Sequence, residues 1–173
     1  MLLRNQKEED RLRKSEAIRK KLFSLKEFKR AKTILFYASF DGEVETLKMM
    51  KQAKKLKKTI ALPIVIKTHR KIIPRLIRNL RTGLCRGAYG ILEPKKGCCE
   101  PLELSKLDLV LVPGIAFDKR NHRLGRGLGY YDRFLRKLPA RIPAIGLAFD
   151  FQVVHRLPPV QSHDVQLSRI VSN

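Results

Sequence analysis

A glycine-rich stretch at residues 123–133, RLGRGLGYYDR, holds the residue types in this chain that are best suited to chemistry. Gly125, Gly127 and Gly129 leave backbone N–H groups uncovered just before a segment with helical spacing. Bare amides at the amino end of a helix favour an anion, and the guanidinium groups of the neighbouring arginines match phosphate oxygens. The spacing fits neither a Walker A loop nor a dinucleotide-binding fingerprint. It therefore indicates either a nucleotide-phosphate site or a flexible loop that closes onto a helix.

Acidic and aromatic residues nearby have alternative interpretations. Asp132 can offset the dipole of the following helix, pair with Arg136, or hold Mg²⁺ beside a phosphate group. Tyr131 falls on an apolar stripe, which predicts core packing, whereas Tyr130 lies off the stripe and is freer to meet a ligand. Glu43 is either an acid in the first turn of another helix or a ligand-binding carboxylate.

Short apolar runs predict the strands that would position these residues, at 33–38, 59–62, 108–112 and 142–149. Helical spacing predicts helices over residues 4–29, 44–57 and 130–138. Pro63 is expected to end the second strand, and residues 65–73 could form a hairpin. The strand–helix–strand order favours parallel strands joined by a right-handed crossover, so we predict one α/β domain over residues 1–173.

Two of the predicted loops leave the carboxyl ends of strands. Glu43 follows the strand that ends at residue 38, and the glycine-rich stretch follows the strand that ends at residue 112. Ligands bind at this edge of open α/β sheets. We therefore expect the two loops to line one crevice.

Charge is the strongest feature of the composition. The 173 residues carry a formal net charge of +22, and residues 64–90 contain seven Lys or Arg and no acid. Such a chain attracts anions, which include nucleic acid, small anionic ligands and counterions around a solvated surface. We interpret most of these charges as surface and a few as ligand contacts.

Other composition features exclude several classes. No run approaches the roughly 18 apolar residues of a membrane span, and the amino end has no signal-peptide core, which predicts a cytoplasmic protein without membrane contact. Cys85, Cys98 and Cys99 lack the paired spacing of a zinc site, so we expect free thiols. The four histidines form no local metal pattern.

Several blocks together resemble the 5-formyltetrahydrofolate cyclo-ligase family, also called methenyltetrahydrofolate synthetases. The longest are VPGIAFD at 112–118 and RLGRGLGYYDRFL at 123–135. Shorter blocks agree in order: GEVET at 42–46, ALP at 61–63, GILEP at 90–94 and His163-Asp164. The resemblance covers roughly residues 15–172.

The resemblance implies an α/β fold and an activity. The fold would be a three-layer α/β/α sandwich with a mostly parallel, Rossmann-like sheet of the sugar-isomerase/CoA-transferase kind. The enzyme would use ATP and Mg²⁺ to convert 5-formyltetrahydrofolate, with or without a polyglutamate tail, to 5,10-methenyltetrahydrofolate through a phosphorylated formyl (iminophosphate) intermediate. It would act as a monomer in the cytoplasm, with no specific nucleic-acid partner.

The resemblance also implies roles for individual residues. Arg126 and Tyr130 would be catalytic, and Asp132 and Asp164 would hold Mg²⁺. ATP would contact Arg123, Leu124, Gly125, Arg126, Gly127, Leu128, Gly129, Tyr130 and Tyr131. The folate would contact Ala38, Glu43, Arg126, Gly127, Leu128, Gly129 and Tyr130.

Three departures from the family pattern leave alternatives open. Family members usually carry an amino-terminal Lys and Arg that contact ATP, which we cannot map onto this chain. Asn121 stands where a glycine is usual, and the tail differs near Ser168 and at Ser172–Asn173. The alternatives are a basic nucleic-acid-binding protein and a folate- or nucleotide-binding paralogue with weak or no turnover.

Overall fold

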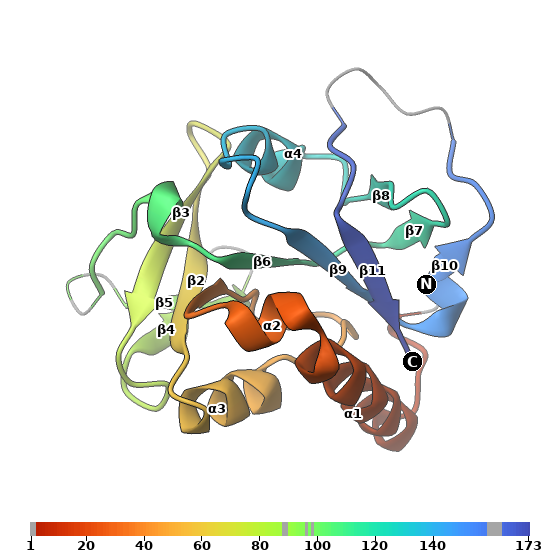
Figure 1. Ribbon diagram of the computed structural model, residues 1–173, viewed down its shortest axis with the longest axis horizontal. Coiled ribbons are helices and arrows are strands. Elements are labelled where there is room, and N and C mark those ends of the chain that lie inside the picture. Colours follow the sequence, from red (N-terminus) through yellow and green to blue (C-terminus); the bar gives the residue numbers. More distant parts are fainter. Residues whose placement is uncertain (1–2, 88–89, 96, 98, 159–163) are drawn as a thin grey trace.

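The structure is a computed structural model and describes residues 3–87, 90–95, 97, 99–158 and 164–173. A six-stranded sheet lies at its centre, with the strand order β11-β9-β6-β1-β2-β3 (Figure 1). Neighbouring strands are parallel, except that β3 runs antiparallel to β2. The strands are β1 (Thr33–Leu35), β2 (Thr59–Ile66), β3 (Lys71–Ile77), β6 (Leu109–Val112), β9 (Ala144–Ala148) and β11 (Arg169–Ser172).

Helices and a small sheet cover the two faces of this sheet. Figure 1 shows α1 (Glu8–Ser24), α2 (Lys26–Arg30) and α3 (Leu47–Lys55) together on one side. The other side carries α4 (Tyr130–Leu135) and a three-stranded sheet of β10 (Val153–Val154), β7 (Ala116–Asp118) and β8 (Arg123–Leu124). The remaining elements are β4 (Leu84–Arg86) paired with β5 (Leu92–Pro94), and the 3₁₀ helices η2 (Leu104–Lys106) and η3 (Asp150–Gln152).

Strand β6 explains why both faces must be covered. All four of its residues are buried, and successive side chains of a strand point to opposite faces. Leu109 and Leu111 pack in the same core cluster as Met50 of α3. Val110 and Val112 pack in a second cluster with Phe134 of α4. The near-continuous apolar run is typical of a parallel sheet buried on both sides, and the predicted three-layer α/β/α class is confirmed.

Strand order places the loops of interest side by side. The chain builds the sheet outward from β1 through β2 to β3, then returns to the other side of β1 and continues from β6 through β9 to β11. β1 and β6 are therefore the neighbours at which the strand order reverses. In doubly wound sheets, ligands bind at the carboxyl ends of such a pair.

Two strand-level expectations have different outcomes. The expectation that Pro63 ends the second strand is wrong, because β2 continues to Ile66 with Pro63 opposite Pro74. Pairing of β2 with β1 ends at Ala61, so Pro63 lies beyond the residues that pair with that neighbour, and the antiparallel pairing with β3 continues past it. The hairpin expected over residues 65–73 is confirmed by the antiparallel pairing of β2 with β3.

Helix and loop boundaries also differ from the predictions. The helix expected over 4–29 is divided into α1 and α2, because Leu25 between them is extended with ψ of 144°. The helix expected to reach residue 138 ends at Leu135, where the chain tightens into turns. The predicted loop between β6 and α4 contains the β7–β8 hairpin. In the turn of that hairpin, Asn121 is left-handed with φ of 64°, as its tolerance for that conformation predicts.

Among the described residues, no helix is both long enough and apolar enough to cross a bilayer.

Candidate active site

A cavity of about 860 Å³ opens where the loops after β1 and β6 meet. Its volume lies in the range of roughly 300–1,000 Å³ that is usual for small-molecule sites. The structure brings every residue predicted for the site to this cavity: Ala38, Glu43, Arg123, Leu124, Gly125, Arg126, Gly127, Leu128, Gly129, Tyr130, Tyr131, Asp132 and Asp164. The expectation that the two loops line one crevice is confirmed.

The glycine-rich loop between β8 and α4 needs glycine for its backbone conformation. Gly127 and Gly129 are left-handed, with φ of 81° and 60°, and Gly129 caps the amino end of α4. A Cβ at Gly127 would meet no atom within 4 Å, so conformation rather than lack of space demands glycine there. The neighbouring Leu128 is exposed, and it lines the cavity together with both glycines.

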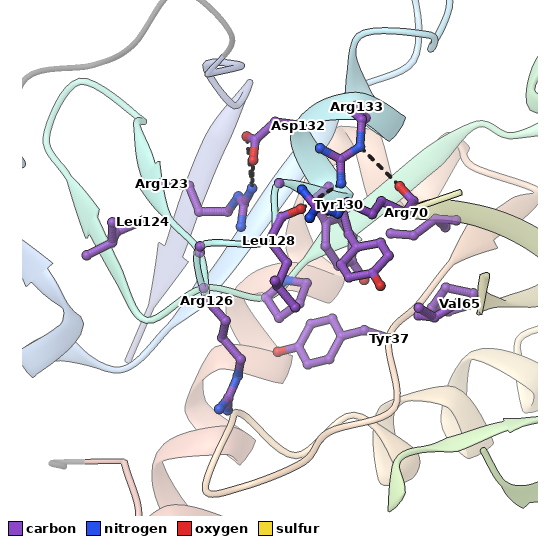
Figure 2. A pocket seen from close by; sticks show the side chains of 18 of the residues that line it. Tyr37, Val65, Arg70, Arg123, Leu124, Arg126, Leu128, Tyr130, Asp132 and Arg133 are labelled. Atoms are coloured by element: carbon purple, nitrogen blue, oxygen red, sulfur yellow. Dashed lines mark hydrogen bonds and ion pairs between the residues drawn. The ribbon is translucent and has the colours of Figure 1, made fainter. Parts of the chain in front are cut away.

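Asp132 is held by an arginine that the sequence did not single out as its partner. The Arg123 Nη2 donates to both carboxylate oxygens of Asp132, at 2.9 and 2.8 Å (Figure 2). Their side chains are only 5% and 13% exposed, so the pair is largely shielded from water. The Arg123 guanidinium also lies 5.6 Å from the ring centre of Tyr131. The structure thus gives Asp132 an ion pair across the loop in addition to its place in the first turn of α4.

The carboxylates of Asp132 and Asp164 come from separate parts of the chain and line the same cavity. Mg²⁺ is usually held by one or two carboxylates, with phosphate oxygens and waters completing its shell. Within the described residues, no group of three or more His, Cys, Asp or Glu side chains is placed to hold a metal. This donor set fits a magnesium ion that is shared with a phosphate-bearing ligand.

Glu43 is a largely buried carboxyl, 13% exposed, at the end of the site that Arg126 reaches. Its Oε2 accepts a hydrogen bond from the Phe40 N–H at 3.1 Å, and its Oε1 lies 3.8 Å from the Arg126 Nη2. Burial raises the pKa of Glu43 to about 7, against the opposing effects of the Phe40 N–H and the Arg126 charge. Glu43 therefore changes its charge near neutral pH.

Arg126 contacts the loop after β1. Its Nη1 lies 3.1 Å from Asp41 Oδ2, and its guanidinium lies 5.8 Å from the ring centre of Phe40. Figure 2 shows its side chain extending away from the Arg123–Asp132 pair. Arg123 and Arg126 therefore lie at different ends of the cavity.

The two tyrosines of α4 both line the cavity and both pack against the core. Tyr131 meets the Phe134 ring edge-on at 6.5 Å, as its place on the apolar stripe predicts. Burial raises the pKa of Tyr131 above its usual value, so its phenol stays neutral at neutral pH. Tyr130 lies beneath the Arg133 guanidinium, 5.8 Å from its ring centre.

Sequence reasoning missed several residues of the cavity wall. Arg133 is the most informative, because its Nε donates to the Arg70 carbonyl at 3.1 Å and its Nη2 donates to the Leu128 carbonyl at 2.6 Å. It thereby joins the tip of the β2–β3 hairpin to the glycine-rich loop, as Figure 2 shows. The sequence predicted the hairpin, but no local sequence pattern predicts that its tip lies at the cavity. Further missed lining residues are Tyr37, Phe40, Val65, Glu93, His122 and Leu157.

Some cysteines and histidines considered in the sequence analysis do not line the cavity, and others lie outside the described residues. Cys85 and Cys99 are not in a disulfide among the described residues and lie outside the cavity lining. Cys98 and His163 lie outside the described residues.

Fold and site together define an α/β protein with a small-molecule cavity at the switch point of a Rossmann-like sheet. Residues 1–173 match the model of the 5-formyltetrahydrofolate cyclo-ligase family, so the chain belongs to that family. The relatives that it matches are named 5-formyltetrahydrofolate cyclo-ligases, and the chain is accordingly an enzyme of the cyclo-ligase class.

Sequence and structure relatives agree with this assignment. The 5-formyltetrahydrofolate cyclo-ligase of Haemophilus influenzae is 36% identical over 152 residues, covering 86% of this chain and 79% of that protein. The enzyme of the same name from Escherichia coli K12 is 33% identical over 143 residues, covering 82% and 78%. The solved 5,10-methenyltetrahydrofolate synthetase of Aquifex aeolicus is 36% identical with a TM-score of 0.84, covering 98% and 82%. The Mycoplasma pneumoniae synthetase is 27% identical with a TM-score of 0.78, covering 98% and 91%.

Proposed function

We propose that the chain converts 5-formyltetrahydrofolate to 5,10-methenyltetrahydrofolate with ATP and Mg²⁺, releasing ADP and phosphate. The observation that carries the proposal is the convergence of Glu43, Arg126 and Asp132 on one cavity in a member of the cyclo-ligase family. The γ-phosphoryl group of ATP passes to the formyl oxygen and ADP leaves. The neighbouring folate nitrogen then attacks the activated carbon, the carbon–oxygen bond to phosphate breaks, and the nitrogen loses its proton.

The folate end of the site is assigned to the loop after β1 and to the adjoining part of the glycine-rich loop. Glu43 offers a buried carboxylate that can accept N–H donors of a pterin ring, and Ala38 forms part of the wall beside it. Residues 126–130 close the other side. Arg70 and Arg133 bring positive charge to the hairpin side of the cavity, which suits the carboxylates of a glutamate or polyglutamate tail.

The nucleotide end is assigned to residues 123–131. Left-handed Gly127 and Gly129 allow phosphate oxygens to approach the backbone closely. Asp132 and Asp164 are the residues that would hold Mg²⁺, which when bound neutralises phosphate charge. Arg126 would meet the phosphoryl group as it reaches the formyl oxygen, and Tyr130 would border the reacting atoms.

An assay of methenyltetrahydrofolate formation, followed by its absorbance, tests this proposal. The wild-type chain is expected to turn over only with ATP and Mg²⁺, and R126A and D132A should each lose most of that rate. Matched controls are R13A and D10A, which alter an exposed ion pair on α1 outside the cavity. Binding of folate or ATP without turnover would instead support the non-catalytic paralogue, and salt-sensitive RNA binding without turnover would support the nucleic-acid-binding alternative.

A further inference from the structure

The chain turns sharply at residues 40–43, and the turn places two carboxylates beside Arg126. Asp41 and Gly42 both have positive φ, of 56° and 81°, and the Glu43 N–H donates to the Phe40 carbonyl at 3.1 Å. Two left-handed central residues are the pattern of a type I′ turn, for which Asp-Gly is a favoured pair. This geometry lets the side chains of Asp41 and Glu43 reach the same guanidinium.

Asp41 makes the closer of the two contacts with Arg126. The separation is 3.1 Å from Asp41 and 3.8 Å from Glu43. The Asp41 side chain is 14% exposed, so its carboxylate is largely shielded, whereas Arg126 is half exposed and would otherwise sample many positions. Asp41 and the Phe40 ring together hold the guanidinium against the loop after β1.

The amino-terminal segment holds Asp41 from its other side. The Arg4 Nε donates to Asp41 Oδ1 at 2.5 Å, while Arg126 occupies Oδ2. The Gln6 Nε2 donates to the Gly42 carbonyl at 3.2 Å, and a Cβ on Gly42 would lie 2.1 Å from the Leu3 carbonyl oxygen. Each carboxylate oxygen of Asp41 thus has its own arginine, which restrains rotation of the carboxylate.

We propose that Asp41 is a positioning residue of the reaction: it holds the Arg126 guanidinium at the folate end of the cavity while Glu43 is engaged by the substrate. The proposal rests on the proposed function, in which pterin N–H groups draw on the Glu43 carboxylate. Once Glu43 accepts those donors, Asp41 is the carboxylate that continues to hold Arg126. A guanidinium fixed in advance stabilises transferring charge without reorganising during the reaction.

The variant D41N tests this role without disturbing the turn, since Asn-Gly is also a favoured type I′ pair. We expect kcat to fall about tenfold, because Arg126 loses its anchor when charge is transferred. The Kd for 5-formyltetrahydrofolate, measured by calorimetry without ATP, should change less than about twofold, because Glu43 is intact. D41E should recover part of the rate.

Two comparisons separate positioning from a structural role. The double variant D41N/R126Q should have the same kcat as R126Q alone, because Asp41 acts through Arg126. R4Q is the matched comparison: it removes only the outer partner of Asp41, leaves the Asp41–Arg126 contact in place, and should therefore lower kcat by less than D41N does.

The outcomes are distinct. Wild-type kcat in D41N, an equal loss in R4Q, or an independent loss from D41N in the R126Q background would each overturn the inference while wild-type turnover stands. Absence of turnover in the wild-type chain would instead contradict the proposed function.

Discussion

Asp132 and Glu43 are two largely shielded carboxylates of the cavity, and each lies beside an arginine. The two arginines compensate the carboxylate charges to different extents. Asp132 receives two short hydrogen bonds from Arg123, so its charge is directly compensated. Glu43 has only a 3.8 Å approach from Arg126, and burial dominates its pKa. The proposed nucleotide end therefore holds an ion pair, whereas the proposed folate end holds a carboxyl whose charge depends on pH.

The raised pKa of Glu43 predicts a pH-dependent stability. Between pH 4.5 and about 7 the folded chain keeps a proton that the unfolded chain releases, so this residue lowers the free energy of unfolding as the pH rises through that window. E43Q mimics the neutral carboxyl and should be more stable than the wild type at pH 8 by about 1–3 kcal/mol, with the gain shrinking toward pH 5. Urea unfolding at the two pH values measures the difference.

Glu16 provides a control of opposite sign for that measurement. Its hydrogen bond from Arg19 holds the pKa of Glu16 below its ordinary value, so its contribution to stability is present above pH 4.5 and is lost as the pH falls. E16Q should therefore lose a little stability at neutral pH. An equal effect of E43Q at pH 5 and pH 8 would contradict the burial of a titrating carboxyl at Glu43.

The Arg123–Asp132 pair predicts a large loss of stability when one partner is removed. R123M leaves a shielded carboxylate without its compensating charge, which typically costs about 3 kcal/mol or more. The double variant R123M/D132N should recover part of this loss, because it removes the charge left behind. Chemical denaturation of the wild type, R123M, D132N and the double variant measures the coupling, and an R123M protein as stable as the wild type would contradict a shielded pair.

At the scale of elements, the site is made by loops that a rigid sheet brings together. β1 and β6 are neighbours, so the turn at residues 40–43 and the glycine-rich loop meet although about 85 residues separate Asp41 from Arg126. The β2–β3 hairpin closes a third side through the Arg133 hydrogen bonds. We therefore expect function to depend on loop conformation as well as on side chains.

Gly127 tests that dependence against a matched glycine. Gly127 and Gly97 have φ of 81° and 82°, and a Cβ at either would meet no atom within 4 Å. G127A and G97A should therefore each cost about 1–2 kcal/mol of stability from backbone strain. Only G127A should also reduce turnover, by about tenfold, because it alone reshapes the cavity wall. Equal turnover in the two variants would contradict a role for the loop conformation.

Sequence patterns predicted which helices and strands form better than they predicted where these elements end and what their loops contact. The apolar run of β6, the hairpin after β2 and the meeting of the two loops could all be predicted, because they depend on local periodicity and on strand order. The predicted end of β2 at Pro63 was wrong, because the antiparallel pairing with β3 carries the strand on to Ile66. The contacts of Arg133 and Asp41 depend on tertiary approach between distant loops, which local patterns do not encode.

At the scale of the whole molecule, charge is the dominant property. A net charge of +22 raises the local concentration of anions around the chain, including ATP and folates. We expect kcat/KM for 5-formyltetrahydrofolate to fall severalfold between about 50 and about 500 mM NaCl, with a steeper fall for a pentaglutamate form. Steady-state kinetics at several salt concentrations measure this, and sucrose at matched viscosity is the control. A flat salt dependence for both forms would contradict electrostatic attraction of the substrate.

Turnover of 5-formyltetrahydrofolate by the purified chain tests the central claim most directly. The account predicts that methenyltetrahydrofolate forms only with ATP and Mg²⁺, that one phosphate is released per product, and that D132A loses most of the rate while D10A retains it. Product formation independent of ATP, or no product from a folded wild-type chain supplied with both ligands, would contradict the account.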